Sequence, residues 1–357
     1  MNHFYRLYRP ATAVPHRNDS TYTEITPCSA LRPYIKCFWG SVGPSAAKAT
    51  AGELIIPDTC MDIIFEINHS QNSMKSRFVG INNEAFFSAG STEEKDTSPP
   101  FGIRFFAWSA AMFSQDSMNG VKNKVFDVQY HYEAIKTALE PILYEVTDIH
   151  ARAREAEKIL LRRLDSARHK PVLDAAIGAL LARKGNIRTT SLADEVFLST
   201  RQLERLFADY TGVSPKQLSS LVRYQYLWHD ILTEDSFHPA NAVHKYGYTD
   251  QSHLLHDFKR YHTLLPAQAK DYALKKAEKK VVYNTSQIPR RRIRHTAGFM
   301  SQNYNTKYVR RLIIILYIKR FRQASYRSSS KTRRKYYAVR KTIFTNKDMG
   351  IPECQRN

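Results

Sequence analysis

The sequence predicts an α+β fold with several domains: an all-β barrel or sandwich, a helical connector, an all-α domain and a basic, disordered tail. Three observations support this prediction. Short runs of β-branched and aromatic residues, separated by turn residues, fill the region from residue 22 to about 130. Helical periodicity replaces them from about residue 131, and an excess of Lys and Arg begins near residue 279. A chain of 357 residues, 43% of them apolar, can form two domains with separate cores.

Residues 22–130 are predicted to form the β domain, after an N-terminal extension of residues 1–21. Four segments combine β-branched and aromatic residues with turn residues: "ELIIPDTCMDIIFEIN", "SRFVGI", "AFFSAG" and "FGIRFFAW". In the first of them, Asp58 follows Pro57 and precedes Cys60 and Asp62. A catalytic or metal-binding role is one interpretation of this group. An Asp in a Pro-containing turn between strands is more often a turn former, which is the interpretation we favour.

The cysteines and the hydropathy pattern indicate a cytoplasmic protein. Cys28, Cys37, Cys60 and Cys354 lack the spacing of a metal site or of a disulfide scaffold. The first residues contain no apolar run typical of a signal peptide, and no stretch reaches the ~18 apolar residues of a membrane span. We therefore predict neither export nor a membrane partner.

Residues 131–168 are predicted to form the helical connector. It contains "YEAIKTALEPILYEV" and "ARAREAEKILLRRLDSA", and in the second of these Ile159, Leu160 and Leu164 recur on one face. Such helices connect domains or pair two chains, and the pattern leaves both interpretations open.

Residues 169–274 contain two similar helical units, at about 188–212 and 237–262. Each unit consists of a short helix, a tight turn and a second helix with a Leu and a Phe four positions apart, followed by Pro. These pairs are Leu203 with Phe207 and Leu254 with Phe258. A longer helix around "SSLVRYQYLWHDILT" separates the units. Two helix-turn-helix units joined by one helix are the simplest interpretation.

The second helix of each unit has one apolar side and one polar side. In the first unit Ser199 is the predicted N-cap, Arg201 and Arg205 lie opposite the Leu and Phe pair, and Glu204 flanks them. Arg can bind guanine and Glu can bind cytosine in the major groove of DNA. A solvated charged face is the alternative, and the duplication of the unit favours DNA contact.

The corresponding helix of the second unit begins after Asp250, its predicted N-cap. Its outward side carries Ser252, His253, His256 and Arg260. The two histidines could be taken for a metal pair, but no third ligand of suitable spacing follows them. We predict no catalytic residue, no metal site and no cofactor in the chain.

Three motifs in this region resemble the AraC/XylS family of bacterial transcriptional regulators: "LSTRQLERLFADYTGVSP", "VRYQYL" and "GYTDQSHLLHDFKRY". The resemblance implies sequence-specific binding to double-stranded promoter or operator DNA, with the two recognition helices in successive segments of the major groove. It places base contacts on Arg201, Glu204, Arg205, Gln251, Ser252 and His256. It also places His253 within reach of a phosphate.

The second unit departs from the family pattern at two places. Ala242 and Val243 stand where the family usually has Ile and Ala, and "TLLP" (263–266) stands where it has Gly-x-Thr-Pro. Without that Gly the helix loses its easy left-handed C-cap. We therefore expect the second unit to be less stable and its base contacts to be less secure.

The β region also resembles a family, the cupin-like domain of uncharacterised function that precedes AraC-type DNA-binding domains. The segments "ALRPYIKCFWG", "LIIPDTCMDIIFEIN", "FVGI" and "FGIRFFAW" carry this similarity. It implies an effector-sensing or dimerising domain, with a small-molecule effector and a second copy of the chain as partners.

The net charge of +21 belongs almost entirely to the tail. Residues 279–357 contain 21 basic and 2 acidic residues, which leaves 33 basic and 31 acidic residues in the rest of the chain. The tail, which we place at residues 275–357, is either a cationic arm that binds DNA without sequence preference or a read-through or frameshift product without function. Its seven apolar residues from Leu312 to Ile318 are too few to span a bilayer.

Two rival functions follow from these observations. One is a nonspecific nucleic-acid binder that depends on the basic tail. The other is an enzyme that uses the β domain, with the DNA-binding part as an appendage. The β domain lacks the clustered His and Glu residues of a metal-dependent enzyme, because His69 is alone there, so we favour the transcription regulator.

Overall fold

The computed structural model describes residues 4–15, 22–41, 52–88 and 100–286. The tail from residue 287 onward, for which disorder was expected, lies outside these residues. The described residues as far as Asn284 belong to one compact unit of the chain.

The β domain contains a six-stranded antiparallel sheet and a separate antiparallel pair of strands. The order in the large sheet is β1-β2-β7-β4-β5-β8, and β3 pairs with β6. In the described part of the chain β1 and β8 are edge strands, so the sheet is open and the barrel alternative is wrong. The strands are β1 (Thr23–Ile25), β2 (Ile35–Gly40), β3 (Glu53–Ile55), β4 (Cys60–Asn68), β5 (Ser73–Val79), β6 (Phe86–Ser88), β7 (Phe101–Phe106) and β8 (Val125–Asp127).

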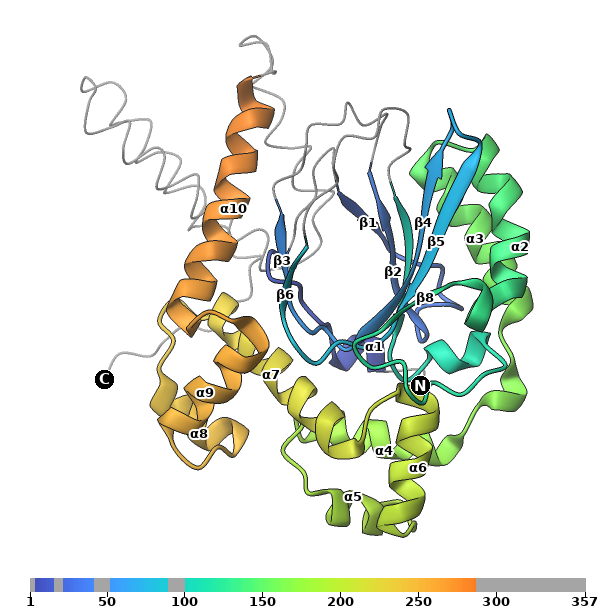
Figure 1. The fold of residues 1–357 in the computed structure, drawn as a ribbon. Helices are drawn as coiled ribbons and strands as arrows, with labels where there is room; N and C mark the ends of the chain where they lie inside the picture. The colour runs from blue at the N-terminus through green and yellow to red at the C-terminus, as the bar shows by residue number, and fades with distance from the viewer. Residues whose placement is uncertain (1–3, 16–21, 42–51, 89–99, 287–357) are drawn as a thin grey trace, which may run out of the picture. The chain divides into compact units, whose positions relative to one another are not determined.

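Two helices, α2 (Gln129–Glu145) and α3 (Ile149–Arg163), cover the apolar face of the large sheet. The ring of Tyr132 in α2 lies 5.0 Å from Phe78 and 6.0 Å from Phe105, measured between ring centroids. Figure 1 shows both helices along one face of the sheet and the β3 and β6 pair on the side of the other face. The predicted connector is therefore helical, and its apolar residues complete the core of the β domain.

The rest of the described chain is helical. Short helices η1 (Ala110–Phe113) and η2 (Ser166–Arg168) flank α2 and α3 along the chain, and α1 (Phe4–Leu7) precedes the sheet. The C-terminal helices are α4 (Pro171–Ala182), α5 (Thr189–Glu195), α6 (Thr200–Thr211), α7 (Pro215–Thr233), α8 (Pro239–Tyr246), α9 (Gln251–His262) and α10 (Pro266–Ser286). Helices α5 with α6 and α8 with α9 are the two predicted helix-turn-helix units, and α7 joins them.

The second helix of each unit ends in a left-handed residue, but only one of the two is a glycine. Helix α6 ends at Gly212 with φ +71°, whereas α9 ends at Thr263 with φ +62°. The missing glycine therefore does not remove the cap of the second unit. It leaves a β-branched residue in a backbone conformation that such residues adopt only under strain.

Candidate nucleic-acid interface

Helix α6 is fixed at its start by reciprocal hydrogen bonds. The hydroxyl of Ser199 accepts from the backbone N–H of Gln202 at 3.3 Å, and the side-chain oxygen of Gln202 accepts from the backbone N–H of Ser199 at 2.9 Å. This capping box confirms Ser199 as the N-cap. Leu203 and Phe207 are fully buried, so one side of the helix is anchored in the domain.

The opposite side of α6 carries the predicted base-contacting residues. Arg201, Glu204 and Arg205 are all exposed, and none of their side chains forms a hydrogen bond or ion pair with another described residue. The helix thus presents two guanidinium groups and one carboxylate to solvent. The side chains are arranged as a recognition helix requires, and their contacts with bases remain a prediction.

Helix α9 repeats this arrangement. The carboxylate of Asp250 accepts from the backbone N–H of His253 at 2.8 Å, as predicted for the N-cap, and Leu254 and Phe258 are fully buried. His253 also packs edge-on against Tyr248 at 5.3 Å between ring centroids. The predicted contact residues on this helix are all exposed: Gln251, Ser252, His253 and His256.

Two buried polar groups, which were not predicted from the sequence, hold α9 against its neighbours. Asp257 is only 6% exposed and accepts from Arg260 at 2.7 Å and from the hydroxyl of Tyr248 at 3.2 Å. The guanidinium of Arg223, from α7, lies 3.7 Å from the same carboxylate. Arg260 lies on the outward side, as periodicity predicted, and is 51% exposed, but its guanidinium is paired with Asp257 of the same helix.

His262 is the second of these groups. It is fully buried, and its Nδ1 lies 2.8 Å from the hydroxyl of Tyr224 in α7. Its ring stacks on Phe258 at 5.0 Å and meets Trp228 edge-on at 4.5 Å. Burial lowers the pKa of His262 to about 3, so the imidazole is neutral at physiological pH and is part of the core between α7 and α9.

Comparison with known families agrees with this geometry. Residues 192–272 match a family described as a helix-turn-helix domain (HTH_18). These residues are an AraC-type helix-turn-helix domain. Residues 23–127 match a domain of unknown function (DUF6597), and comparison with the curated proteins gave no match. The chain therefore carries a DNA-binding domain of transcription regulators, preceded by a domain of unknown function.

Solved structures of low similarity include two bacterial proteins. A transcriptional regulator from Chromobacterium violaceum with an AraC-type DNA-binding domain is 22% identical over 29% of this chain and 92% of its own, with a TM-score of 0.27. ToxT from Vibrio cholerae is 12% identical over 66% of this chain and 98% of its own, with a TM-score of 0.35. A ToxT structure with a bound unsaturated fatty acid is 10% identical over 71% of this chain and 96% of its own, with a TM-score of 0.31.

The β domain contacts the AraC-type domain at the C-terminal end of α6. The backbone N–H of Met118 donates to the carbonyl of Asp209 at 2.8 Å, and the hydroxyl of Ser117 donates to its carboxylate at 3.0 Å. Gly212 lies so close to this loop that a Cβ atom there would come within 2.7 Å of Val121. The position of α6 is thus tied to the β domain.

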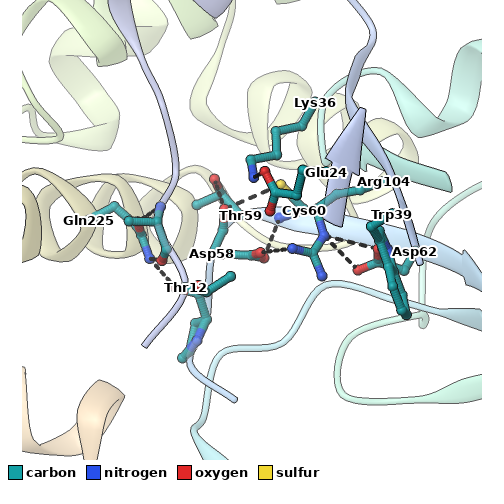
Figure 2. Close-up of polar contacts among 12 residues, drawn as sticks. Thr12, Glu24, Lys36, Trp39, Asp58, Thr59, Cys60, Asp62, Arg104 and Gln225 are labelled. Atoms are coloured by element: carbon teal, nitrogen blue, oxygen red, sulfur yellow. Dashed lines mark hydrogen bonds and ion pairs between the residues drawn. The ribbon is translucent and has the colours of Figure 1, made fainter. Parts of the chain in front are cut away.

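A second contact joins α7 to the turn that precedes β4. Gln225 (Figure 2) is only 2% exposed, and its amide donates to the carbonyls of Pro57 at 2.6 Å and Ala11 at 3.2 Å. Trp228 donates from Nε1 to the carbonyl of Thr12 at 3.1 Å. The N-terminal segment (residues 4–13) therefore lies against α7 through its backbone.

The same turn leads into a partly buried ionic cluster on the other face of the large sheet. Arg104 pairs with Asp62 at 3.0 Å and faces Asp58 at 3.4 Å, and Trp39 donates from Nε1 to Asp62 at 2.7 Å (Figure 2). Asp58 also accepts from the backbone N–H of Cys60 at 3.1 Å, as expected of a turn former. Burial raises the pKa of Asp58, although the positive charge of Arg104 opposes this. The ion pair itself was not predicted.

A bulge in β2 adds a second ion pair to this face. Ile35 and Cys37 pair with the adjacent residues Phe105 and Arg104, so Lys36 is the extra residue between them. Lys36 donates to Glu24 at 2.6 Å. Burial tends to raise the pKa of Glu24, but the charges of Lys36 and Arg104 outweigh it and lower the pKa to about 2. Side chains alternate between the two faces along each strand. This alternation would place Asp62 and Arg104 on one face only if the pairing of β4 with β7 were already known.

In the described ranges no group of three or more His, Cys, Asp or Glu side chains is arranged to hold a metal ion. No helix among the described residues is long and apolar enough to cross a membrane.

Proposed function

We propose that the protein is a sequence-specific transcription regulator that binds two neighbouring segments of the major groove with α6 and α9. The observation that carries this proposal is the duplication of one arrangement. Each helix is capped by a side chain at its start, is anchored by a buried Leu and Phe pair, and exposes polar residues on its other side. Two recognition helices on one face of DNA fit major-groove segments about one helical turn, ~34 Å, apart.

The exposed residues of each helix suggest their partners. Arg201 and Arg205 would donate to guanine, Glu204 would accept from cytosine, and Gln251 would bind adenine. Ser252 and His256 are the remaining base-contacting residues that we propose on α9. For His253, which packs against Tyr248, we propose a phosphate contact.

We further propose that the β domain regulates DNA binding, through an effector or through pairing of two copies. Two contacts support this proposal: the loop of Ser117 and Met118 holds the end of α6, and the turn at Pro57 holds α7. A change in the β domain that moves either contact would alter how α6 and α9 are placed on DNA.

Selection from a random-sequence DNA pool with the full chain, followed by sequencing of the retained fraction, tests the proposal. We expect enrichment of a two-part site with its parts about ten base pairs apart. Retention without enrichment, together with affinity that collapses as salt rises, would instead indicate a nonspecific binder that depends on the tail.

A further inference from the structure

Phe197 occupies the turn between α5 and α6 in an unusual way. Its side chain is 95% exposed, more than any other large apolar side chain in the described residues. Its backbone has φ +56°, in the left-handed region that favours glycine. A bulky aromatic residue in this conformation destabilises the turn, and its exposed ring gains no stability from burial.

The second helix-turn-helix unit shows what this turn requires. The backbone N–H of Leu198 donates to the carbonyl oxygen of Ala193 at 3.0 Å, and the backbone N–H of Tyr248 donates to the carbonyl oxygen of Val243 at 3.0 Å. Each bond spans five residues, so the residues just before Leu198 and Tyr248 are equivalent. In the second unit that residue is Gly247, with φ +65°. The turn can therefore form with glycine, and the ring of Phe197 has no role in the turn itself.

The place of Phe197 in the chain connects it with DNA. It lies two residues before Ser199, the N-cap of α6, and four residues before Arg201. The N-terminal residues of a recognition helix contact base edges, so the turn that leads into the helix lies beside the major groove. A phenyl ring has no hydrogen-bonding group and requires an apolar partner. The apolar group that bases expose in the major groove is the C5-methyl group of thymine.

We propose that Phe197 contacts a thymine methyl group next to the bases bound by α6 and is a specificity-determining residue. This inference rests on the proposed function, because it requires α6 to enter the major groove. The ring would add a preference for thymine that the polar residues of α6 do not supply.

The experiment uses the full chain and the DNA site obtained by selection, with each thymine replaced in turn by uracil, which lacks only the methyl group. For the unsubstituted protein we expect about five- to tenfold weaker binding at one of these replacements. Phe197→Gly should bind the thymine and uracil sites equally, with the affinity that the unsubstituted protein has for uracil. Because glycine suits the left-handed turn, the melting temperature of this variant should not fall.

A second exposed ring provides the control for Phe197→Gly. Phe87→Gly removes another exposed ring, on β6 and 65% exposed, and should retain the preference for thymine. Equal thymine preference in Phe197→Gly and the unsubstituted protein would overturn the proposal. A uniform loss of affinity on every sequence would also overturn it, since the ring would then contact the sugar-phosphate backbone. Failure to select any site would refute the proposed function instead.

Discussion

The side-chain amide of Gln225 donates a hydrogen bond of 2.6 Å to the carbonyl oxygen of Pro57, although 168 residues separate them. The amide oxygen of Gln225 accepts from the backbone N–H of Ala11 at 2.8 Å. One buried side chain therefore joins α7 of the AraC-type domain, the turn before β4 and the N-terminal segment.

Replacement of Gln225 should destabilise the protein because its partners would remain buried. We expect Gln225→Leu to lower the free energy of unfolding by roughly 2–4 kcal/mol, since each unsatisfied buried group costs about 1–3 kcal/mol. Chemical denaturation measures this change. Tyr226→Phe is the control: it removes a hydroxyl that donates to the carbonyls of Leu7 at 3.2 Å and Leu181 at 3.4 Å from a more exposed position, and it should cost about 1 kcal/mol or less. Equal effects of the two variants would contradict the role we assign to Gln225.

Arg205 should determine base preference at one position of the site. We expect Arg205→Ala to relax that preference and to weaken specific binding by roughly 1–3 kcal/mol, because a bidentate contact with guanine is lost. Selection from a random pool measures the preference directly. Arg154→Ala, which removes an exposed Arg from α3, should leave it unaltered. An unaltered site for Arg205→Ala would show that another residue recognises that base.

His262 should make stability depend on pH. The pKa of its imidazole is about 3 in the folded protein, below the value of about 6.5 in the unfolded chain, so protonation favours unfolding. The contribution of neutral His262 is fully present above pH ~6.5 and is lost as pH falls toward 3, by about 1.4 kcal/mol per pH unit. We expect His262→Phe to be less stable at neutral pH, because the buried hydroxyl of Tyr224 loses its hydrogen-bond partner, but to have a flatter stability profile between pH 4 and 6. If the stability of the variant and of the unsubstituted protein changed in parallel with pH, His262 would not be the group responsible for the pH dependence.

The left-handed caps of α6 and α9 should respond to substitution in opposite directions. Thr263→Gly should stabilise the protein by about 0.5–1 kcal/mol because it relieves the strain of a β-branched residue at φ +62°. Gly212→Ala should destabilise it by more than about 1 kcal/mol, because the added Cβ would meet Val121. Thermal unfolding of both variants checks this prediction, and a loss of stability in Thr263→Gly would exclude strain at that cap.

The basic tail should not determine sequence preference. We expect a chain that ends after Ser286, the last residue of α10, to select the same DNA site as the full chain. The dependence of affinity on salt then tests the arm hypothesis, because each phosphate contact contributes about −0.9 to the slope of log affinity against log salt. An equal slope in both chains would exclude a DNA-binding role for the tail. Loss of all binding in the shortened chain would indicate a nonspecific binder that depends on the tail.

Local features of the fold could be predicted from the sequence because they depend on neighbouring residues. The caps Ser199 and Asp250 and the buried pairs on α6 and α9 follow from spacings of three and four residues. Contacts between distant residues could not be predicted in this way. The pairing of Asp62 with Arg104 depends on strand register, and the bond between Gln225 and Pro57 depends on how the helices meet the β domain. The positive φ of Phe197 could not be predicted for a different reason, because a bulky aromatic residue rarely adopts this conformation.

The N-terminal segment (residues 4–13) occupies a binding site that is formed by α7 and the turn before β4. Tyr8 is 2% exposed, bonds to Thr59 at 2.9 Å and packs its ring 5.4 Å from Tyr226. Most of the polar contacts of this segment with α7 use its backbone, as at Ala11 and Thr12. A chain that lacks residues 1–13 should therefore leave this site open, and a synthetic peptide of residues 4–13 should bind there. Titration with that peptide would measure how strongly the two domains are held together through it.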